Sequence, residues 1–238
     1  MIDLIVIPAR KNSKRLKNKN ILMLGHKKLI EWTIDHAKQI FPINNIVVSS
    51  DSDEILNLSL TKGIVNSWVR PKKLSTSKAS SADVCIHVST QYEKKCSTEV
   101  KNIILLQPTS PFRNIYSTKK GVKLFKANPN VSVVAMTKSK EHPFWCFKNS
   151  TNRKSKTVEP YMNHSFLSKP SQDLPPSFFP TGSFFMISKD QLLKYKSFYT
   201  PKILPLLIND RSETIDIDTF DDFEFAKRCL IKLKKEKL

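Results

Sequence analysis

Apolar and polar residues alternate along this chain in blocks that predict strands and helices in turn. Short runs that are almost wholly apolar predict buried strands, and apolar residues spaced three or four apart predict amphipathic helices. The predicted strands are 2–8, 45–50, 64–69, 102–107, 131–137 and 182–188. The predicted helices are 29–40, 53–61, 80–94, 117–126 and 220–233. This alternation is typical of an α/β fold, a Rossmann-like, mostly parallel sheet with helices on both faces.

The alternation stops between about residues 138 and 180. This segment is rich in proline, serine, lysine and aromatic residues, and it is too long for an ordinary loop inside a compact domain. We therefore expect one domain over residues 1–238, with a small element inserted at about 138–180 that protrudes from it. Two short extended segments, 203–208 and 214–217, are expected before the last helix.

Polar motifs follow three of the predicted strands. PAR (8–10), SSD (49–51) and QPTSP (107–111) each stand at or just beyond the carboxyl end of a strand. In a parallel sheet these ends meet at one edge, and ligands bind in the crevice outside it. The sequence therefore predicts a ligand site built from these three segments.

Six cations follow the first predicted strand within ten residues, 10–19. The loop has none of the glycine patterns that wrap backbone amides around phosphates. Arg10 can bind a polyphosphate as a bidentate fork, and Lys14 and Lys19 can bind it as point charges. The hydroxyl of Ser13 can donate a further hydrogen bond. From these residues alone, a solvated lysine-rich loop is an equal alternative.

The whole chain carries a net charge of +19, which is typical of proteins that bind polyanions. The excess is mostly lysine spread along the chain, so a lysine-rich composition explains it without nucleic acid. A nucleic-acid-binding protein remains the alternative, and its affinity would fall steeply with salt.

Neither a membrane span nor a disulfide framework is expected. No run of 18 apolar residues exists, and the N-terminal residues predict a core strand rather than a signal peptide. The cysteines lack both CxxC pairing and zinc-site spacing. We expect a cytoplasmic protein with free, buried thiols at Cys85, Cys96, Cys146 and Cys229.

Six segments resemble those of the CMP-sialic acid synthetases, the N-acylneuraminate cytidylyltransferases, and they occur in the family's order. They are ARxxSKxxxxKN (9–20), VVSSDSDEI (47–55), RPKKLSTSKASS (70–81), LLQPTSPFR (105–113), KEHPFW (140–145) and TIDIDTFDDF (214–223). The chain is identified as a member of this family. Membership implies a nucleotidyltransferase that joins CTP to a nine-carbon 2-keto sugar acid and releases pyrophosphate.

The resemblance implies that CTP binds beside the first strand. Arg10, Lys14 and Lys19 would be the catalytic cations on the triphosphate. The implied CTP-binding residues are Arg10, Ser13, Lys14, Lys19, Asn20, Arg70, Ala79 and Ser81. Capping of the following helix is the alternative role of Ser80 and Ser81, and one residue can serve both roles.

The resemblance also implies a pocket for a nonulosonic acid, either N-acylneuraminate or a relative such as legionaminic or pseudaminic acid. The implied sugar-binding residues are Gln107, Thr109, Ser110, Arg113, Gln172, Phe185, Phe198 and Tyr199. Core packing is the alternative for the aromatic residues, and a turn without further role is the alternative for 108–111. Segment 138–180 matches the family's dimerisation element, where one subunit reaches over its partner's site, so a homodimer is implied.

Asp216 and Asp218 match the family's magnesium ligands, so Mg²⁺ is the implied cofactor. One residue separates them, so a strand would place both carboxylates on the same face. Two carboxylates there are costly unless a cation lies between them, and Mg²⁺ takes hard oxygen ligands together with substrate phosphates. Capping of the last helix by Asp218 is the alternative.

Several positions depart from the family pattern. Ser77 stands where the family has an acidic residue, Ser171 and Phe179 replace arginines, and Thr181 replaces an asparagine. In the phosphate loop, Lys11, Asn12 and Arg15 replace the family's small or glycine-rich turns. These departures leave the acceptor open. The alternatives are a cytidylyltransferase for 3-deoxy-octulosonate, a nucleotidyltransferase for a sugar phosphate, or an inactive homologue. No histidine spacing identifies a general base.

Overall fold

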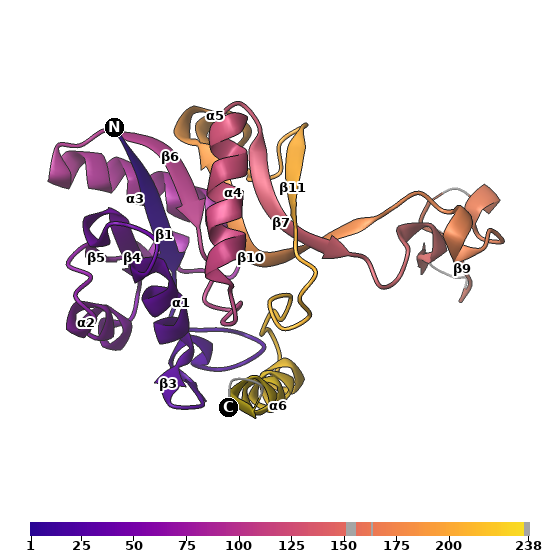
Figure 1. Ribbon diagram of the computed structural model, residues 1–238, viewed down its shortest axis with the longest axis horizontal. Helices are drawn as coiled ribbons and strands as arrows, with labels where there is room; N and C mark the ends of the chain where they lie inside the picture. Colours follow the sequence, from indigo (N-terminus) through magenta and orange to yellow (C-terminus); the bar gives the residue numbers. More distant parts are fainter. Residues whose placement is uncertain (151–155, 163, 236–238) are drawn as a thin grey trace.

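The computed structural model describes residues 1–150, 156–162 and 164–235 (Figure 1). Within this part, seven strands form one sheet in the order β11-β7-β10-β6-β1-β4-β5. They are β1 (Ile2–Pro8), β4 (Ile46–Ser50), β5 (Ser67–Val69), β6 (Val100–Leu105), β7 (Ser132–Lys138), β10 (Phe178–Ser188) and β11 (Ile203–Leu207). β10 runs antiparallel to β6 and β7, and the other neighbours are parallel. The expected α/β fold with a mostly parallel sheet is confirmed.

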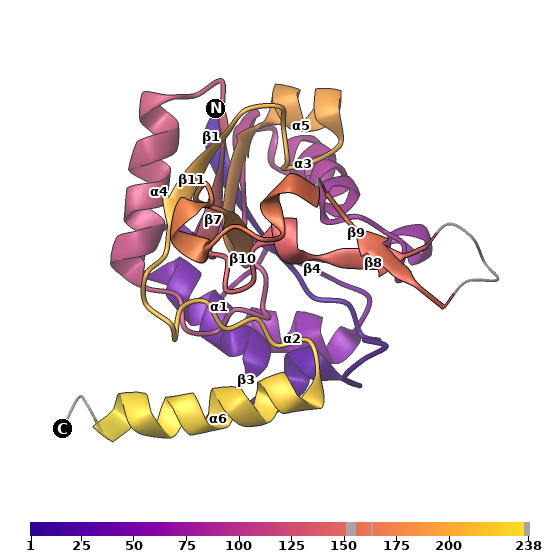
Figure 2. The ribbon, with the colours of Figure 1, turned by 90° about the vertical axis from the view of Figure 1, so that its right-hand side faces the viewer.

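Helices cover both faces of the sheet, with α4 on one side and α3 and α5 on the other (Figure 2). Side chains of a strand point alternately to its two faces. Leu4 and Val6 of β1 therefore pack with α3 and α5, whereas Ile5 and Ile7 pack with α1, α2 and α4. The helices are α1 (Leu29–Lys38), α2 (Asp53–Thr61), α3 (Ser81–Cys96), α4 (Ile115–Ala127) and α5 (Lys189–Tyr195).

The last helix, α6 (Phe220–Lys235), lies beyond the carboxyl end of β1 (Figure 1). One of its faces packs against the small hairpin of β2 (Met23–Leu24) and β3 (Lys27–Lys28) and against the start of α1. The packed residues are Phe223, Ala226 and Leu230 of α6, with Leu24, Leu29, Ile215 and Ile217. This third apolar cluster fixes the segment that precedes α6 against the edge where the polar motifs end.

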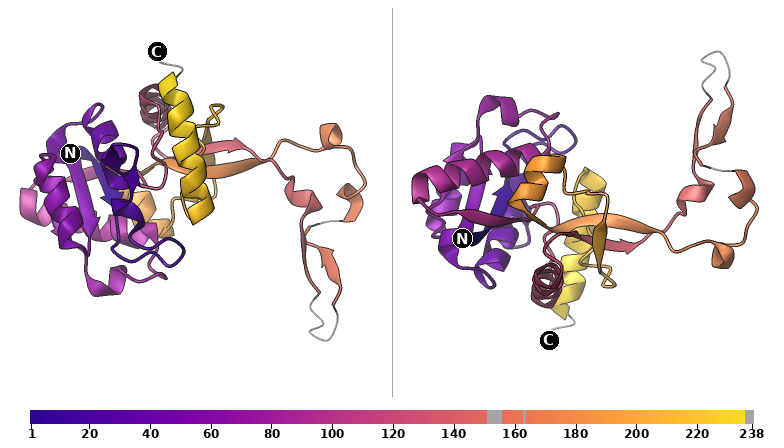
Figure 3. Two further views of the ribbon diagram at one scale, coloured as in Figure 1. Left: turned by 90° about the horizontal axis from the view of Figure 1, so that it is seen from below. Right: turned by 90° about the horizontal axis from the view of Figure 1, so that it is seen from above.

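A long arm leaves the body where β7 and β10 extend beyond the sheet (Figures 1 and 3). It carries β8 (Phe147–Asn149) and β9 (Val158–Pro160), which pair antiparallel. Several large apolar side chains of the arm are exposed: Phe147, Val158, Tyr161, Met162, Phe178 and Phe179. The arm comprises most of the segment that was expected to protrude, and β10 begins earlier than expected because its first residues pair with the end of β7.

Further elements differ from the sequence-based expectations. β5 is shorter and begins at Ser67. α5 was not predicted, because seven residues are too few to show helical periodicity. Residues 214–217 form a turn and irregular chain rather than an extended strand. Their backbone instead joins the QPTSP turn, where the N–H of Ile217 donates to the carbonyl oxygen of Thr109 at 2.8 Å.

The expectations for the cysteines and for the membrane can be compared with the same described residues. All four cysteines are free, as expected. Cys85 is buried, as expected, whereas Cys96 and Cys229 are only half-buried. Cys146 is exposed on the arm, so the expected burial is wrong there. Among the helices described, none has the length and apolar character needed to cross a membrane.

Candidate active site

Two cavities open at the edge of the sheet where β1, β4 and β6 end, and they share a wall. The first has a volume of about 310 Å³, and cationic side chains from the loop after β1 line it. The second has a volume of about 480 Å³, and aromatic side chains from β10 and the α5–β11 connection line it. We call them the basic cavity and the aromatic cavity. The residues that line both are Ser80, Ser81, Gln107 and Asp216.

The basic cavity brings together most of the residues implied in CTP binding. Those that line it are Arg10, Lys19, Asn20, Arg70, Ala79 and Ser81, together with Thr109, Asp216 and Asp218. Arg70 is buried behind the end of β4, where its backbone N–H donates to the carbonyl oxygen of Ser50 at 2.7 Å. Burial lowers the pKa of its guanidinium to about 10.

The cationic loop keeps its shape without glycine. Asn18 adopts the left-handed conformation, with φ of 53°, which asparagine tolerates better than most residues. The side-chain amide of Asn20 donates to the carbonyl oxygen of Arg10 at 2.9 Å and ties the ends of the loop together. The N–H of Lys11 donates to Asp51 at 2.6 Å. This bond anchors the loop to the SSD motif, as the common edge of the sheet predicts.

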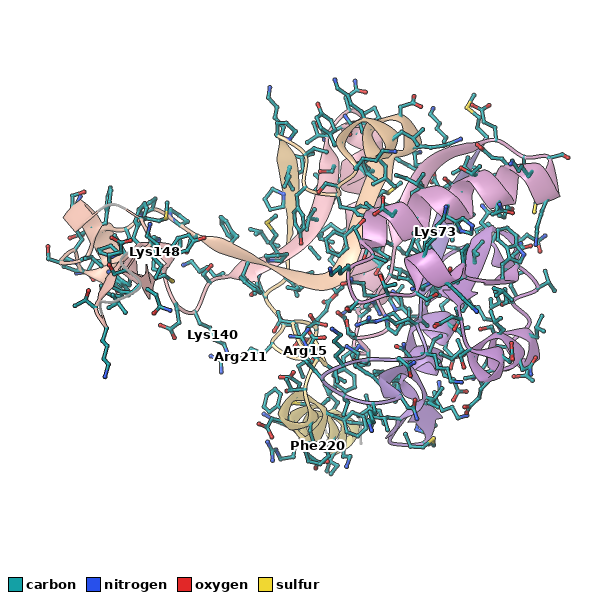
Figure 4. The ribbon with its side chains drawn as sticks, turned by 180° about the vertical axis from the view of Figure 1, so that it is seen from behind. Arg15, Lys73, Lys140, Lys148, Arg211 and Phe220 are labelled. Carbon is teal, nitrogen blue, oxygen red and sulfur yellow. The ribbon has the colours of Figure 1, made fainter. Side chains whose placement is uncertain are left out.

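Two cations from the loop contact Asp218. Lys19 Nζ lies 2.8 Å from one carboxylate oxygen, and Arg15 Nη2 lies 2.6 Å from the other. Lys19 is buried, whereas Arg15 is exposed, between the sheet and α6 (Figure 4). Arg15 is not among the predicted site residues. It is one of six cations within residues 10–19, and nothing in its position distinguishes it from the others. Two cations and a carboxylate are therefore in direct contact at the wall of the basic cavity.

Asp216 lines both cavities, and its side chain is exposed to them. The surrounding protein atoms desolvate its carboxyl and raise the pKa above the ordinary value, and the charge of Asp218 also raises it. A hydrogen bond with the Thr109 side chain and the charge of Lys19 oppose this shift. Two neighbouring carboxylates that both line the basic cavity form a donor set that suits a hard divalent cation.

Capping of α6 does not require Asp218. The hydroxyl of Thr219 accepts from the N–H of Asp222 at 3.2 Å, and the Asp222 carboxylate accepts from the N–H of Thr219 at 2.8 Å. This reciprocal capping box leaves the Asp218 carboxylate to the cavity. By contrast, Ser80 does cap its helix by accepting from the N–H of Asp83 at 3.0 Å, and it lines both cavities as well.

Aromatic rings form one wall of the aromatic cavity. The Phe185 ring lies 5.5 Å from the ring of Phe198 and 6.0 Å from that of Tyr199, measured between centroids. Phe185 and Phe198 are buried, while Tyr199 is exposed. Across the cavity, the amide nitrogen of Gln107 lies 3.5 Å from the hydroxyl oxygen of Ser81. Apolar rings facing polar groups suit a ligand with both apolar and polar faces, such as a sugar.

Gly182 allows β10 to approach the shared wall closely. Its φ is +75°, and a Cβ at this position would lie 2.9 Å from Oε1 of Gln107 and 3.6 Å from Oδ2 of Asp216. Only glycine fits both the backbone conformation and this space.

Arg113 and Ser110 lie beneath the cavities and line neither of them. The buried guanidinium of Arg113 donates to the carbonyl oxygens of Gln107 and Ser183. Burial lowers the pKa of this guanidinium to about 9. The hydroxyl of Ser110 donates to the carbonyl oxygen of Thr181 at 3.3 Å. These bonds hold the QPTSP turn against β10, and sugar contact by either residue stays a prediction.

Comparison of the chain with known proteins shows the family to which it belongs. The family model for cytidylyltransferases matches residues 4–230. The chain belongs to the cytidylyltransferase family. This confirms the resemblance to the CMP-sialic acid synthetases and the expected enzyme class. A solved structure of CMP:2-keto-3-deoxy-manno-octonic acid synthetase complexed with CTP has a TM-score of 0.69 over 97% of this chain and 98% of that one, at 15% identity, which shows the shared fold.

Three relatives of this cytidylyltransferase are named as a CMP-sugar acid synthase or as cytidylyltransferases of sugar acids. CMP-N,N'-diacetyllegionaminic acid synthase of Legionella pneumophila is 33% identical, over 99% of this chain and 98% of the relative. N-acylneuraminate cytidylyltransferase of Escherichia coli is 31% identical over 98% of this chain, which spans 53% of that relative's length. Pseudaminic acid cytidylyltransferase of Campylobacter jejuni is 29% identical over 99% of both chains.

Besides Ser110 and Arg113, three more predicted residues of the cytidylyltransferase line neither cavity: Ser13, Lys14 and Gln172. Lys14 is exposed on the cationic loop, and Gln172 is exposed in the 3₁₀ turn η6 (Ser171–Asp173). η6 belongs to the segment that forms the arm (Figure 3). Their roles stay predictions. Of the departures from the family pattern, Phe179 lines the aromatic cavity and Ser77 lines the basic cavity.

Replacing Gly182 by alanine is expected to lower kcat of the cytidylyltransferase roughly 100-fold, because the new methyl group would lie 2.9 Å from Oε1 of Gln107 and displace that side chain from the shared wall. Steady-state rates of pyrophosphate release measure this loss. The matched control is Gly63→Ala, which also changes a glycine of positive φ, +82°, but meets only the side chain of Ile43. Equal activity of the two variants would contradict the role assigned to Gly182.

Proposed function

We propose that this cytidylyltransferase transfers CMP from CTP to the anomeric 2-hydroxyl of a nonulosonic acid and releases pyrophosphate. The observation that carries the proposal is the shared wall of the two cavities at Gln107 and Asp216. A nucleotide in the basic cavity and a sugar acid in the aromatic cavity would meet at this wall. The names of the relatives, which concern legionaminic, neuraminic and pseudaminic acids, support the same acceptor class.

In this proposal the triphosphate of CTP lies against the cationic loop. Arg10, Lys19 and Arg15 already line the basic cavity, and charge-assisted bonds to phosphate contribute about 1.5–3 kcal/mol each. Ser13 and Lys14 would join them when the loop closes on the ligand. On the far wall, Arg70, Ala79 and Ser81 would contact the nucleoside.

Magnesium fits the carboxylate pair of Asp216 and Asp218. The described residues contain no cluster of three or more histidine, cysteine, aspartate or glutamate side chains that could hold a metal. The remaining ligands would then be phosphate oxygens and water, as Mg²⁺ prefers. When bound, Mg²⁺ would neutralise charge on the reacting phosphates. Lys19 and Arg15 keep Asp218 directed into the cavity.

The residues of this chain supply mainly position and charge. The acceptor hydroxyl attacks the α-phosphorus, and pyrophosphate leaves in line, which requires little covalent chemistry from the protein. Gln107 and Asp216 stand on the shared wall where hydroxyl and α-phosphate would meet. Arg113 keeps Gln107 in place by binding its carbonyl oxygen. We expect this reaction in the cytoplasm, where CTP is made.

A panel assay tests the proposed reaction. The protein is incubated with CTP, Mg²⁺ and one acceptor at a time, and pyrophosphate is followed. The acceptors are N-acetylneuraminic, legionaminic and pseudaminic acids, 3-deoxy-octulosonate and a sugar 1-phosphate. We expect turnover with at least one nonulosonic acid, at a kcat/KM well above those of the last two. Turnover with only 3-deoxy-octulosonate or the sugar phosphate, or with no acceptor, would contradict the proposal.

We also propose a homodimer in which the arm of one subunit lies over its partner's site. The exposed apolar side chains of the arm support an interface, because large apolar patches on a soluble surface mark interaction sites. Such an arrangement would bring Gln172 to the partner's acceptor. Sedimentation velocity at working concentration should show a dimer, and a monomer would remove this inference.

A further inference from the structure

Few charged residues line the aromatic cavity. Among the described residues that line it, Lys196 is the only cation and Asp216 the only acidic residue. The other residues that line it are neutral, and Phe179, Phe185, Phe198 and Tyr199 are aromatic. An anionic ligand in this cavity would be repelled by Asp216. Lys196 is the residue of this wall that can offset that repulsion.

Lys196 has an unusual backbone conformation. It caps the C-terminus of α5 in the left-handed region, with φ of 51° and ψ of 27°. Its N–H donates to the carbonyl oxygen of Leu192 at 3.0 Å, which fixes the turn. Glycine is the usual residue at such a helix end, because a Cβ is disfavoured in this conformation. A lysine at a position where glycine fits better points to a use for its side chain.

The ammonium group of Lys196 is available to a ligand. No carboxylate in the described ranges forms an ion pair with it. Its neighbours on the same helix differ in this respect. Lys189 pairs with Glu93 at 2.6 Å, and Lys194 lies over the ring of Tyr195, with Nζ 5.2 Å from the centroid. Lys196 is exposed and borders the cavity instead.

We propose that Lys196 binds the carboxylate of the acceptor and thereby selects a sugar acid over a neutral sugar. This inference rests on the proposed function, in which the acceptor is a 2-keto acid with its carboxylate next to the reacting carbon. An ammonium group pairs with a carboxylate through a charge-assisted hydrogen bond. Lys196 would thus be a specificity-determining residue, whereas the transfer step depends on the groups at the shared wall.

The variant Lys196→Gly tests this role without straining the backbone, because glycine adopts the observed φ at no steric cost. We expect KM for the acceptor to rise roughly 10-fold, with KM for CTP unchanged and thermal stability equal or higher. Lys196→Arg should restore most of the acceptor affinity. The matched control is Lys194→Ala, which removes a cation from the same helix outside the cavity and should leave both KM values unchanged.

A neutral analogue of the acceptor, its C1 carboxamide, separates this role from a general loss of shape. Wild-type protein should discriminate between acid and amide, and in Lys196→Gly the discrimination should shrink by the factor by which KM for the acid rises. If the wild-type protein turns over the acid and Lys196→Gly discriminates between acid and amide by the same factor as the wild type, the inference is overturned. Equal rises in KM for CTP and for the acceptor would overturn it as well. Absence of wild-type turnover with every acid would instead refute the proposed function.

Discussion

The Asp216→Asn variant is expected to release pyrophosphate roughly 1000-fold more slowly than the wild-type protein with CTP, Mg²⁺ and a nonulosonic acid. Asparagine keeps the size of the side chain but removes the charge that faces both cavities. It also replaces one carboxylate oxygen by an NH2 group, which cannot bind a hard cation, and leaves a neutral carbonyl oxygen in place of the charged one. The kcat at saturating substrates measures the loss.

A second measurement tests whether the loss of activity in Asp216→Asn arises from weaker binding of nucleotide and metal rather than from misfolding. Binding of MgCTP should raise the Tm of the wild-type protein, since a ligand of the native state stabilises it. The shift should be much smaller in Asp216→Asn. The matched control is Asp221→Asn, an exposed residue in the first turn of α6 that lines neither cavity. Activity of Asp216→Asn within a few-fold of this control, with the Tm shift intact, would refute the role of Asp216.

Replacing Lys14 by alanine is expected to abolish measurable CMP-sugar formation, a loss of at least roughly 100-fold. Lys14 is exposed on the cationic loop and lines neither cavity. Its substitution should therefore leave the fold intact, which circular dichroism and thermal unfolding can verify. The loss would arise because closure of the loop on CTP brings this cation to the triphosphate. Pyrophosphate release at saturating acceptor provides the measurement.

Lys17 supplies the matched control for Lys14. It is an exposed lysine of the same loop and stands outside the motif positions that the family resemblance assigns. Lys17→Ala should retain turnover to within a few-fold, because it removes only a distant charge that salt screens. Near-normal turnover in Lys14→Ala would contradict the triphosphate assignment. Equal losses in the two variants would indicate a general effect of net charge.

The sequence predicted the sheet well because its signals are local. The strand that became β1 is the nearly continuous apolar run expected of a strand buried on both faces, and the apolar stripe of α1 shows helical spacing. Residues 214–217 illustrate the limit. The alternation of apolar and acidic residues there suits a strand, but these residues pair with the QPTSP turn through Ile217 and Thr109 rather than with a strand. A contact between distant segments overrides a local pattern that is only four residues long.

The site was predictable where motif residues stand at strand ends. Arg10 and Gln107 follow the ends of β1 and β6, and the parallel topology brings them to one edge. Asp216 comes from an irregular segment that the bond between Ile217 and Thr109 holds at the same edge. Gly182 and Lys196 were missed. Their importance depends on a positive φ and on neighbours from other elements, and neither property leaves a periodic signal in the sequence.

A structure of the protein with CTP and Mg²⁺ bound tests the central claim most directly. The account predicts the triphosphate in the basic cavity, in contact with Arg10, Lys14 and Lys19. It also predicts a magnesium ion between the phosphates and the carboxylates of Asp216 and Asp218, with the α-phosphate facing the aromatic cavity. A nucleotide bound elsewhere, or a cationic loop directed away from the phosphates, would contradict the account.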